Sequence, residues 1–143
     1  PTFAEISGAA LPGRKIDGVS ILSLIEGREG ANPRESFVYY YNKNDLEAVT
    51  DGEFKLVFPH KYVTYGAYEP GNDGQPGKLA NLEKPELYDL RRDPGERYNV
   101  ATQNPERLAK LQKIADKWRA ELGDNLTRQK GTERREPGLV DMK

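Results

Sequence analysis

The run of residues 86–101 constrains the fold of this chain more than any other part of its sequence. Leu87 and Leu90 flank Tyr-Asp, a pattern typical of a short strand that is partly buried on both faces. Asp93 and the proline after it end this strand, because proline fixes its own φ and keeps the preceding residue out of the helical region. Gly95 can adopt a positive φ, so the run predicts a strand, a tight turn and the approach to a helix.

Three more segments have the composition of strands. Residues 37–41 are β-branched or aromatic throughout and predict a central strand. Residues 46–50 and 54–58 lie on either side of Asp51-Gly52, which is the strongest hairpin signal in the chain. The residues expected to share one face of the first hairpin strand are Leu46, Ala48 and Thr50.

Apolar residues recur every three or four positions from Leu108 to Leu122, which predicts one amphipathic helix over 105–122. Asn99 and Asn104 are expected to act as capping residues. Two shorter helices are predicted within 3–8 and 19–26, a long loop over 62–85 and an extended tail over 127–137. The expected fold class is α+β: about four antiparallel strands, preceded by two short helices, with the C-terminal helix packed on one face.

Composition excludes several classes of function. The 143 residues carry a formal net charge of −1, so no overall field favours nucleic acid, and no apolar run is long enough for a membrane span. The absence of cysteine excludes disulfides, thiolate metal sites and a thiol nucleophile within these residues. Phe3 and Ile6 follow Pro1 in the manner of a helix cut at its beginning, and no signal segment is visible, so we expect a fragment of a longer protein.

Several motifs occur together in a characteristic order. Leu87-Tyr88-Asp89-Leu90, then Asp93-Pro94-Gly95-Glu96 and Asn99, resemble a signature near the C-terminus of the type I sulfatases, the arylsulfatase-like branch of the alkaline-phosphatase-like superfamily. Lys15 to Ser20 resembles the segment that joins the large domain of that family to its small one, and Leu122-Gly123-Asp124 resembles the end of its terminal helix. The resemblance implies helices and linker from a larger catalytic domain over 1–34, a sulfatase C-terminal subdomain over 35–124 and a tail over 125–143.

The resemblance also implies where the chemistry of the family lies. Its nucleophile is a formylglycine made from Cys or Ser in a Cys/Ser-x-Pro-x-Arg motif, and its calcium is held by Asp and Asn residues of the large domain. This chain contains neither the motif nor a recognisable ligand set. We therefore expect calcium and formylglycine in a missing N-terminal catalytic domain, no catalytic or metal residue here, and an inactive fragment. A periplasmic, secreted or lysosomal location would suit the family.

Candidate substrate-binding residues lie where the second hairpin strand ends. His60, Lys61 and Tyr62 place an imidazole, an ammonium and a phenol together, and these groups could bind a sulfate or stack on a sugar ring. Asn42, in the turn 41–45, is a second candidate. The alternative is that these are solvated residues at the ends of strands. The expected ligand is a sulfated small molecule or glycan, with no nucleic acid and no membrane as partner.

Two other functions stay open from the sequence. A phosphodiesterase or phosphonate hydrolase of the same superfamily can carry a similar end domain. A stand-alone carbohydrate-binding or interaction module could use the aromatic residues of 62–68 as its platform. The basic pairs Arg91-Arg92 and Arg134-Arg135 could bind a polyanion, but each has acidic neighbours, which favours a solvated face.

Overall fold

The computed structural model describes residues 1–65 and 77–134, which fall into two compact units, Pro1–Glu35 and Ser36–Lys143. The first unit contains α1 (Thr2–Ser7) and α2 (Leu22–Ile25), the two short helices predicted from the sequence. The Thr2 hydroxyl accepts a hydrogen bond from the Ile21 amide at 3.1 Å, and the Ser20 hydroxyl accepts one from the Leu22 amide at 3.3 Å. These bonds satisfy amides near the start of α2.

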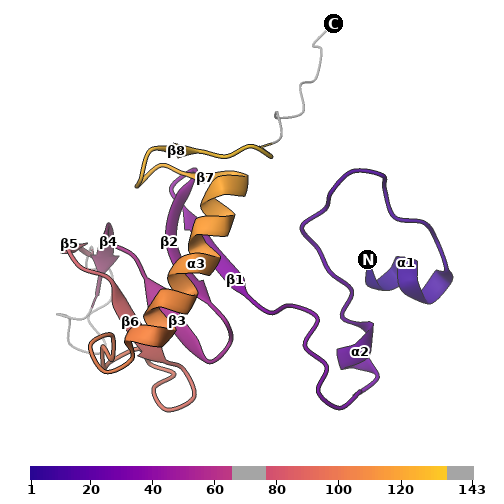
Figure 1. The fold of residues 1–143 in the computed structure, drawn as a ribbon, viewed down its shortest axis with the longest axis horizontal. Helices are drawn as coiled ribbons and strands as arrows, with labels where there is room; N and C mark the ends of the chain where they lie inside the picture. The colour runs from indigo at the N-terminus through magenta and orange to yellow at the C-terminus, as the bar shows by residue number, and fades with distance from the viewer. Residues whose placement is uncertain (66–76, 135–143) are drawn as a thin grey trace, which may run out of the picture. The chain divides into compact units, whose positions relative to one another are not determined.

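The second unit is built on a four-stranded antiparallel sheet in the order β1-β2-β3-β6, with α3 packed against β2 and β3 (Figure 1). The bounds are β1 Phe37–Tyr41, β2 Asp45–Thr50, β3 Phe54–Val57, β6 Glu86–Asp89 and α3 Pro105–Leu122. The α+β prediction and its four strands are confirmed. The prediction that 37–41 is a central strand is wrong, because β1 pairs with β2 alone among the described strands and forms an edge of the sheet.

A register shift decides which side chains of β2 enter the core. Tyr39 pairs with Ala48 but Tyr40 pairs with Leu46, so β2 contains one extra residue, Glu47. Leu46 and Val49 consequently both belong to the core beneath α3, whereas Ala48 lines a hollow on the other face of the sheet. The prediction that Leu46 and Ala48 share one face is wrong because strict alternation fails at a bulge.

The core between the sheet and α3 is small and apolar. Its buried members are Leu46, Val49, Leu56, Phe58, Leu87, Leu111 and Ala115. Leu111 and Ala115 belong to the apolar stripe predicted on the helix, and Val49, Leu56 and Leu87 lie side by side on adjacent strands. A row of paired side chains across three strands gives α3 a continuous apolar surface to cover.

The prediction of a long loop over 62–85 is wrong at both ends. β4 (His60–Thr64) and β5 (Lys78–Leu82) pair as a separate antiparallel ribbon, and residues 66–76 lie outside the described part of the chain. Part of the extended tail predicted over 127–137 lies within the described residues, where it forms a strand. β7 (Gly123–Asp124) pairs with β8 (Gln129–Lys130), and the Thr132 and Glu133 amides then donate to carbonyls at the end of α3.

Several polar side chains of the 86–101 run bind backbone atoms or ion-pair partners. The Asp93 carboxylate accepts from the Arg97 and Tyr98 amides, and the Asn99 carbonyl oxygen accepts from the Leu87 and Ala101 amides. Asn99 therefore closes the outer edge of β6, and neither it nor Asn104 makes a side-chain cap on α3. The positive φ falls on Glu96 at 53°, not on Gly95, and the Glu96 carboxylate binds Lys55 at 2.8 Å.

Tyr40 is expected to make the stability of the domain fall at alkaline pH. Its hydroxyl donates to the Gly123 carbonyl at 2.8 Å, and burial, followed by the nearby negative charge of Asp124, raises its pKa to about 12. The unfolded chain releases this proton near pH 10. Between about pH 10 and 12 the unfolded state therefore binds fewer protons than the folded state, so stability falls as pH rises.

We expect Tyr40→Phe to remove about 1–2 kcal/mol of this alkaline loss, after a discount for the partial exposure of Tyr40. At pH 7 the variant should be less stable by about 0.5–1.5 kcal/mol, because the bond to Gly123 is lost. Urea unfolding at pH 7, 9, 10 and 11 measures both effects. Equal slopes of stability against pH for the wild type and the variant would contradict the assignment. The pKa of Tyr88 is also raised, by burial and by Glu86. Because Tyr88 is present in both proteins, it does not contribute to the difference between them.

Candidate functional site

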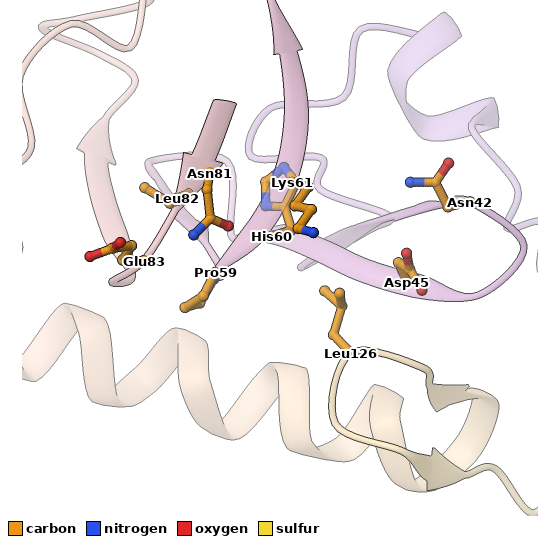
Figure 2. Close-up of a pocket in the computed structure, with 9 residues that line it drawn as sticks. All are labelled: Asn42, Asp45, Pro59, His60, Lys61, Asn81, Leu82, Glu83 and Leu126. Atoms are coloured by element: carbon orange, nitrogen blue, oxygen red, sulfur yellow. The ribbon is translucent and has the colours of Figure 1, made fainter. Parts of the chain in front are cut away.

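The pocket of about 660 Å³ next to β4 brings together three of the four predicted site residues. Asn42 comes from the β1–β2 turn, and His60 and Lys61 come from the start of β4. Figure 2 shows Lys61 and Asn81 on one side, Asn42 and Asp45 across from them, and Leu126 beside the space between. We name this hollow the Lys61 pocket; its remaining lining residues are Pro59, Leu82 and Glu83.

The alternation of β4 separates the predicted residues. Lys61 pairs with Asn81 across the ribbon, so their side chains share one face, and both line the Lys61 pocket. Tyr62 pairs with Ala80 on the opposite face and does not line this pocket. Tyr62 instead lines a second hollow of about 440 Å³ on the sheet face away from α3, with Tyr39 and Tyr41. The four predicted residues thus divide between two hollows.

His60 stands between the two hollows and is held by both ring nitrogens. Nδ1 lies 2.7 Å from the Phe58 carbonyl oxygen and Nε2 lies 3.3 Å from a Glu47 carboxylate oxygen. The side chain of His60 is only 10% exposed. Glu47 is the extra residue of β2, so the bulge brings a carboxylate to the imidazole. Because both nitrogens already face acceptors, His60 serves the pocket as a fixed wall more than as a group available to a ligand.

A buried carboxylate joins two walls of the Lys61 pocket. Asp124 is fully buried, and its Oδ1 accepts from the Leu46 amide at 3.1 Å and the Leu126 amide at 2.9 Å. Its Oδ2 accepts from Nε of Arg119 at 2.9 Å, and the Arg119 guanidinium lies 4.3 Å from the centre of the Phe58 ring. This cluster fixes the end of α3 to β2 and to the turn that carries Leu126.

The β1–β2 turn is also held in place. Asn42 and Lys43 have φ values of 40° and 73°, the two successive positive values of a tight hairpin turn. The Asn44 side-chain amide donates to the Leu122 carbonyl at 3.2 Å, and the Asn125 amide donates to the Asn44 carbonyl at 2.9 Å. The pocket wall that carries Asn42 is therefore anchored to the end of α3.

Sequence reasoning missed Asn81 and Leu126 as pocket residues. Asp45 belongs to the candidate turn 41–45, but Asn81 and Leu126 lie far away in the sequence. Only the pairing of β4 with β5 and the return of the chain after α3 bring them to Lys61. The basic pair Arg91-Arg92 is partnered by Glu53 and Asp89, which agrees with the predicted solvated face. Of the other pair, Arg135 lies outside the described residues.

Two further features of the described residues concern metal binding and membrane crossing. Across residues 1–65 and 77–134, no three His, Asp or Glu side chains are placed to hold one ion. In the same part of the chain, no helix has the length and apolar character needed to cross a membrane.

Comparison with solved structures supports the fold. A structure from work on glycosaminoglycan metabolism by Bacteroides thetaiotaomicron superposes with a TM-score of 0.61 at 26% identity, covering 84% of this chain and 24% of that chain. A sulfatase from Pseudoalteromonas sp. superposes with a TM-score of 0.65 at 16% identity, covering 92% of this chain and 26% of that one. The second likeness, at that low identity, concerns the fold alone.

Comparison of sequences identifies the family. The chain is 35% identical to human arylsulfatase A over 127 residues, which is 80% of this chain and 24% of the relative. It is 32% identical over 130 residues to a Delta 4,5-hexuronate-2-O-sulfatase of Bacteroides thetaiotaomicron, covering 91% of this chain and 23% of that protein. The chain thus spans about a quarter of the length of these relatives. Residues 32–137 match the family described as the C-terminal region of aryl-sulfatase, and the chain belongs to that family.

Proposed function

We propose that this chain is the C-terminal part of an enzyme that hydrolyses sulfate esters, and that the Lys61 pocket borders its substrate cleft. The observation that carries the proposal is the family match over residues 32–137. The pocket adds a cation, Lys61, and the amides of Asn42 and Asn81 in one concave site. Such groups bind sulfate oxygens and sugar hydroxyls.

The reaction chemistry would come from outside these residues. Sulfate ester hydrolysis needs a nucleophile, a metal that polarises the sulfate and a proton donor for the leaving alcohol. We propose that formylglycine and calcium supply the first two in a catalytic domain N-terminal to this segment. The expected role of this segment is to bind and orient substrate, and by itself it should not hydrolyse sulfate esters.

The relatives described above favour sulfate esters over the phosphodiester or phosphonate substrates of the same superfamily. A stand-alone carbohydrate-binding or interaction module is the rival proposal. Of its predicted platform, the aromatic residues of 62–68, Tyr62 lines the second hollow, and residues 66–68 lie outside the described part of the chain. A direct comparison discriminates between the two. Glycan binding by the 143-residue chain, with no aryl-sulfate hydrolysis by the longest natural polypeptide that contains it, would favour the module.

Lys61→Ala tests the role of the pocket. In the complete enzyme we expect KM for a sulfated disaccharide to rise about two- to tenfold, because one charged contact to the substrate is lost. The value of kcat should stay within about twofold, because Lys61 would bind ground state and transition state alike. Steady-state kinetics with the disaccharide measure both constants.

Lys113→Ala is the matched control, since Lys113 is an exposed lysine on α3 that does not line the Lys61 pocket. An increase in KM that is equal in the two variants would mean that Lys61 acts only through overall charge. If Lys61→Ala left KM unchanged, the proposal that the Lys61 pocket borders the substrate cleft would be wrong.

A further inference from the structure

Three polar side chains that line the Lys61 pocket, Asp45, Lys61 and Asn81, converge on one hollow. Several other charged groups of the second unit are paired: Lys55 with Glu96, Arg91 with Glu53 and Lys110 with Asp51. Within residues 1–65 and 77–134, the side chains of Asp45, Lys61 and Asn81 make no hydrogen bond or ion pair with another described residue. Polar groups that converge on one hollow without partners are available to a ligand.

The charges of this pocket do not favour a polyanion. Lys61 is its one exposed cation among the described residues, and His60 is already held by Glu47. Two carboxylates, Asp45 and Glu83, also line the pocket. The first is across the hollow from Lys61, whereas Glu83 lies at the far end beyond Asn81 (Figure 2). One anionic group can bind Lys61, but each additional sulfate would lie near a carboxylate.

The Asp45 carboxylate is better suited to bind an uncharged hydrogen-bond donor than a sulfate. An ionised Asp accepts hydrogen bonds and cannot donate them, so its natural ligand is a hydroxyl or an amine. The Asn42 and Asn81 amides can both donate and accept, as the hydroxyls of a sugar require. Pro59, Leu82 and Leu126 supply apolar surface for the carbon skeleton of a ring.

We propose that the Lys61 pocket selects a sparsely charged, hydroxyl-rich sugar unit of the sulfated substrate and that Asp45 disfavours densely sulfated glycans. This inference rests on the proposed function, because it assigns a substrate class to the same pocket. Asp45 acts here as a specificity-determining residue that touches substrate hydroxyls. The Leu46 and Leu126 amides donate to Asp124, so the backbone on either side of the pocket, including the strand that carries Asp45, is held in place before the ligand arrives.

The test compares two probes in the complete enzyme, a monosulfated and a trisulfated disaccharide of the same sugar backbone. Affinity is measured by isothermal titration calorimetry and hydrolysis by sulfate release. We expect the wild type to bind the monosulfated probe more tightly. Asp45→Asn should shift the ratio of the two dissociation constants toward the trisulfated probe by about two- to fivefold, the size of one exposed charge interaction. Raising the salt concentration should reduce this shift, because screening weakens exposed charge interactions.

Two variants serve as controls. Asp45→Glu keeps the charge and should leave the ratio close to that of the wild type. Glu106→Gln removes an exposed carboxylate in the first turn of α3, outside the pocket, and should also leave it unchanged.

The outcomes separate the inference from the proposed function. Hydrolysis of both probes with an unchanged ratio in Asp45→Asn overturns the inference and leaves the sulfatase proposal intact. Binding with the expected shift but no hydrolysis of either probe supports the pocket and overturns the sulfatase proposal. Binding of neither probe by the wild type overturns the inference.

Discussion

Asp124→Ala is expected to lower the free energy of unfolding of this chain by about 3–5 kcal/mol. The substitution leaves the Arg119 side chain, only 8% exposed, without its buried counter-charge. It also removes the acceptor for the Leu46 and Leu126 amides. Removing one partner of a buried pair costs more than the pair itself contributes, because the remaining charge has been taken out of water. Urea unfolding monitored by the fluorescence of Trp118 measures the change.

Asp116→Ala is the matched control for this prediction. Asp116 binds the same Arg119 at 3.1 Å, but its side chain is 59% exposed. We expect a loss of about 0.2–1 kcal/mol, the size of an exposed pair. Equal losses for the two aspartates would show that burial of Asp124 does not set its contribution. In that case the bonds of Asp124 would not be what holds the pocket walls.

Leu111→Ala is expected to lower the free energy of unfolding by about 2–5 kcal/mol. Leu111 is 1% exposed and lies in the core with the buried side chains of β2, β3 and β6. Truncation removes buried apolar surface and leaves a cavity that the two-layer packing of one helix on one sheet can close only in part. The urea midpoint should fall with little change in the dependence on denaturant.

Leu79→Ala is the control for apolar truncation at an exposed site. Leu79 lies on β5 and is 73% exposed, so its loss should cost less than about 0.5 kcal/mol. If Leu79→Ala destabilised the chain as strongly as Leu111→Ala, the exposed face of the β4–β5 ribbon would be buried in solution. A loss below 1 kcal/mol for Leu111→Ala would contradict the core derived from the helix stripe.

The main sheet and its helix could be predicted because their signals are local and strong. Periodicity placed α3 at 105–122, and the Asp51-Gly52 turn placed the β2–β3 hairpin, in which Gly52 has a φ of 88°. The β4–β5 ribbon was missed because its strands have weak alternation and their pairing joins residues on either side of 66–76. Pairing between separated segments is decided by tertiary packing and not by local propensity.

The candidate site was predictable only in part, for the same reason. His60, Lys61 and Tyr62 are consecutive in the sequence, but Lys61 and Tyr62 line different hollows because successive side chains of a strand point to opposite faces, and His60 lines both. Asn42, in the turn between β1 and β2, lines the same pocket as Lys61. The sequence named both residues as candidates but did not show that they lie near each other. The substrate role of all four residues stays a prediction.

The sequence by itself determined the family, the α+β class and the amphipathic helix, because these depend on short motifs and on apolar periodicity. Tertiary structure alone decided that Glu47 is bulged toward His60 and that Asp124 ties Leu46 to Leu126. It also decided that Asp45 and Asn81 border Lys61. The physical reason is that a buried charge, a bulge or a shared pocket depends on contacts between segments far apart in the chain, and neither propensity nor periodicity records those contacts.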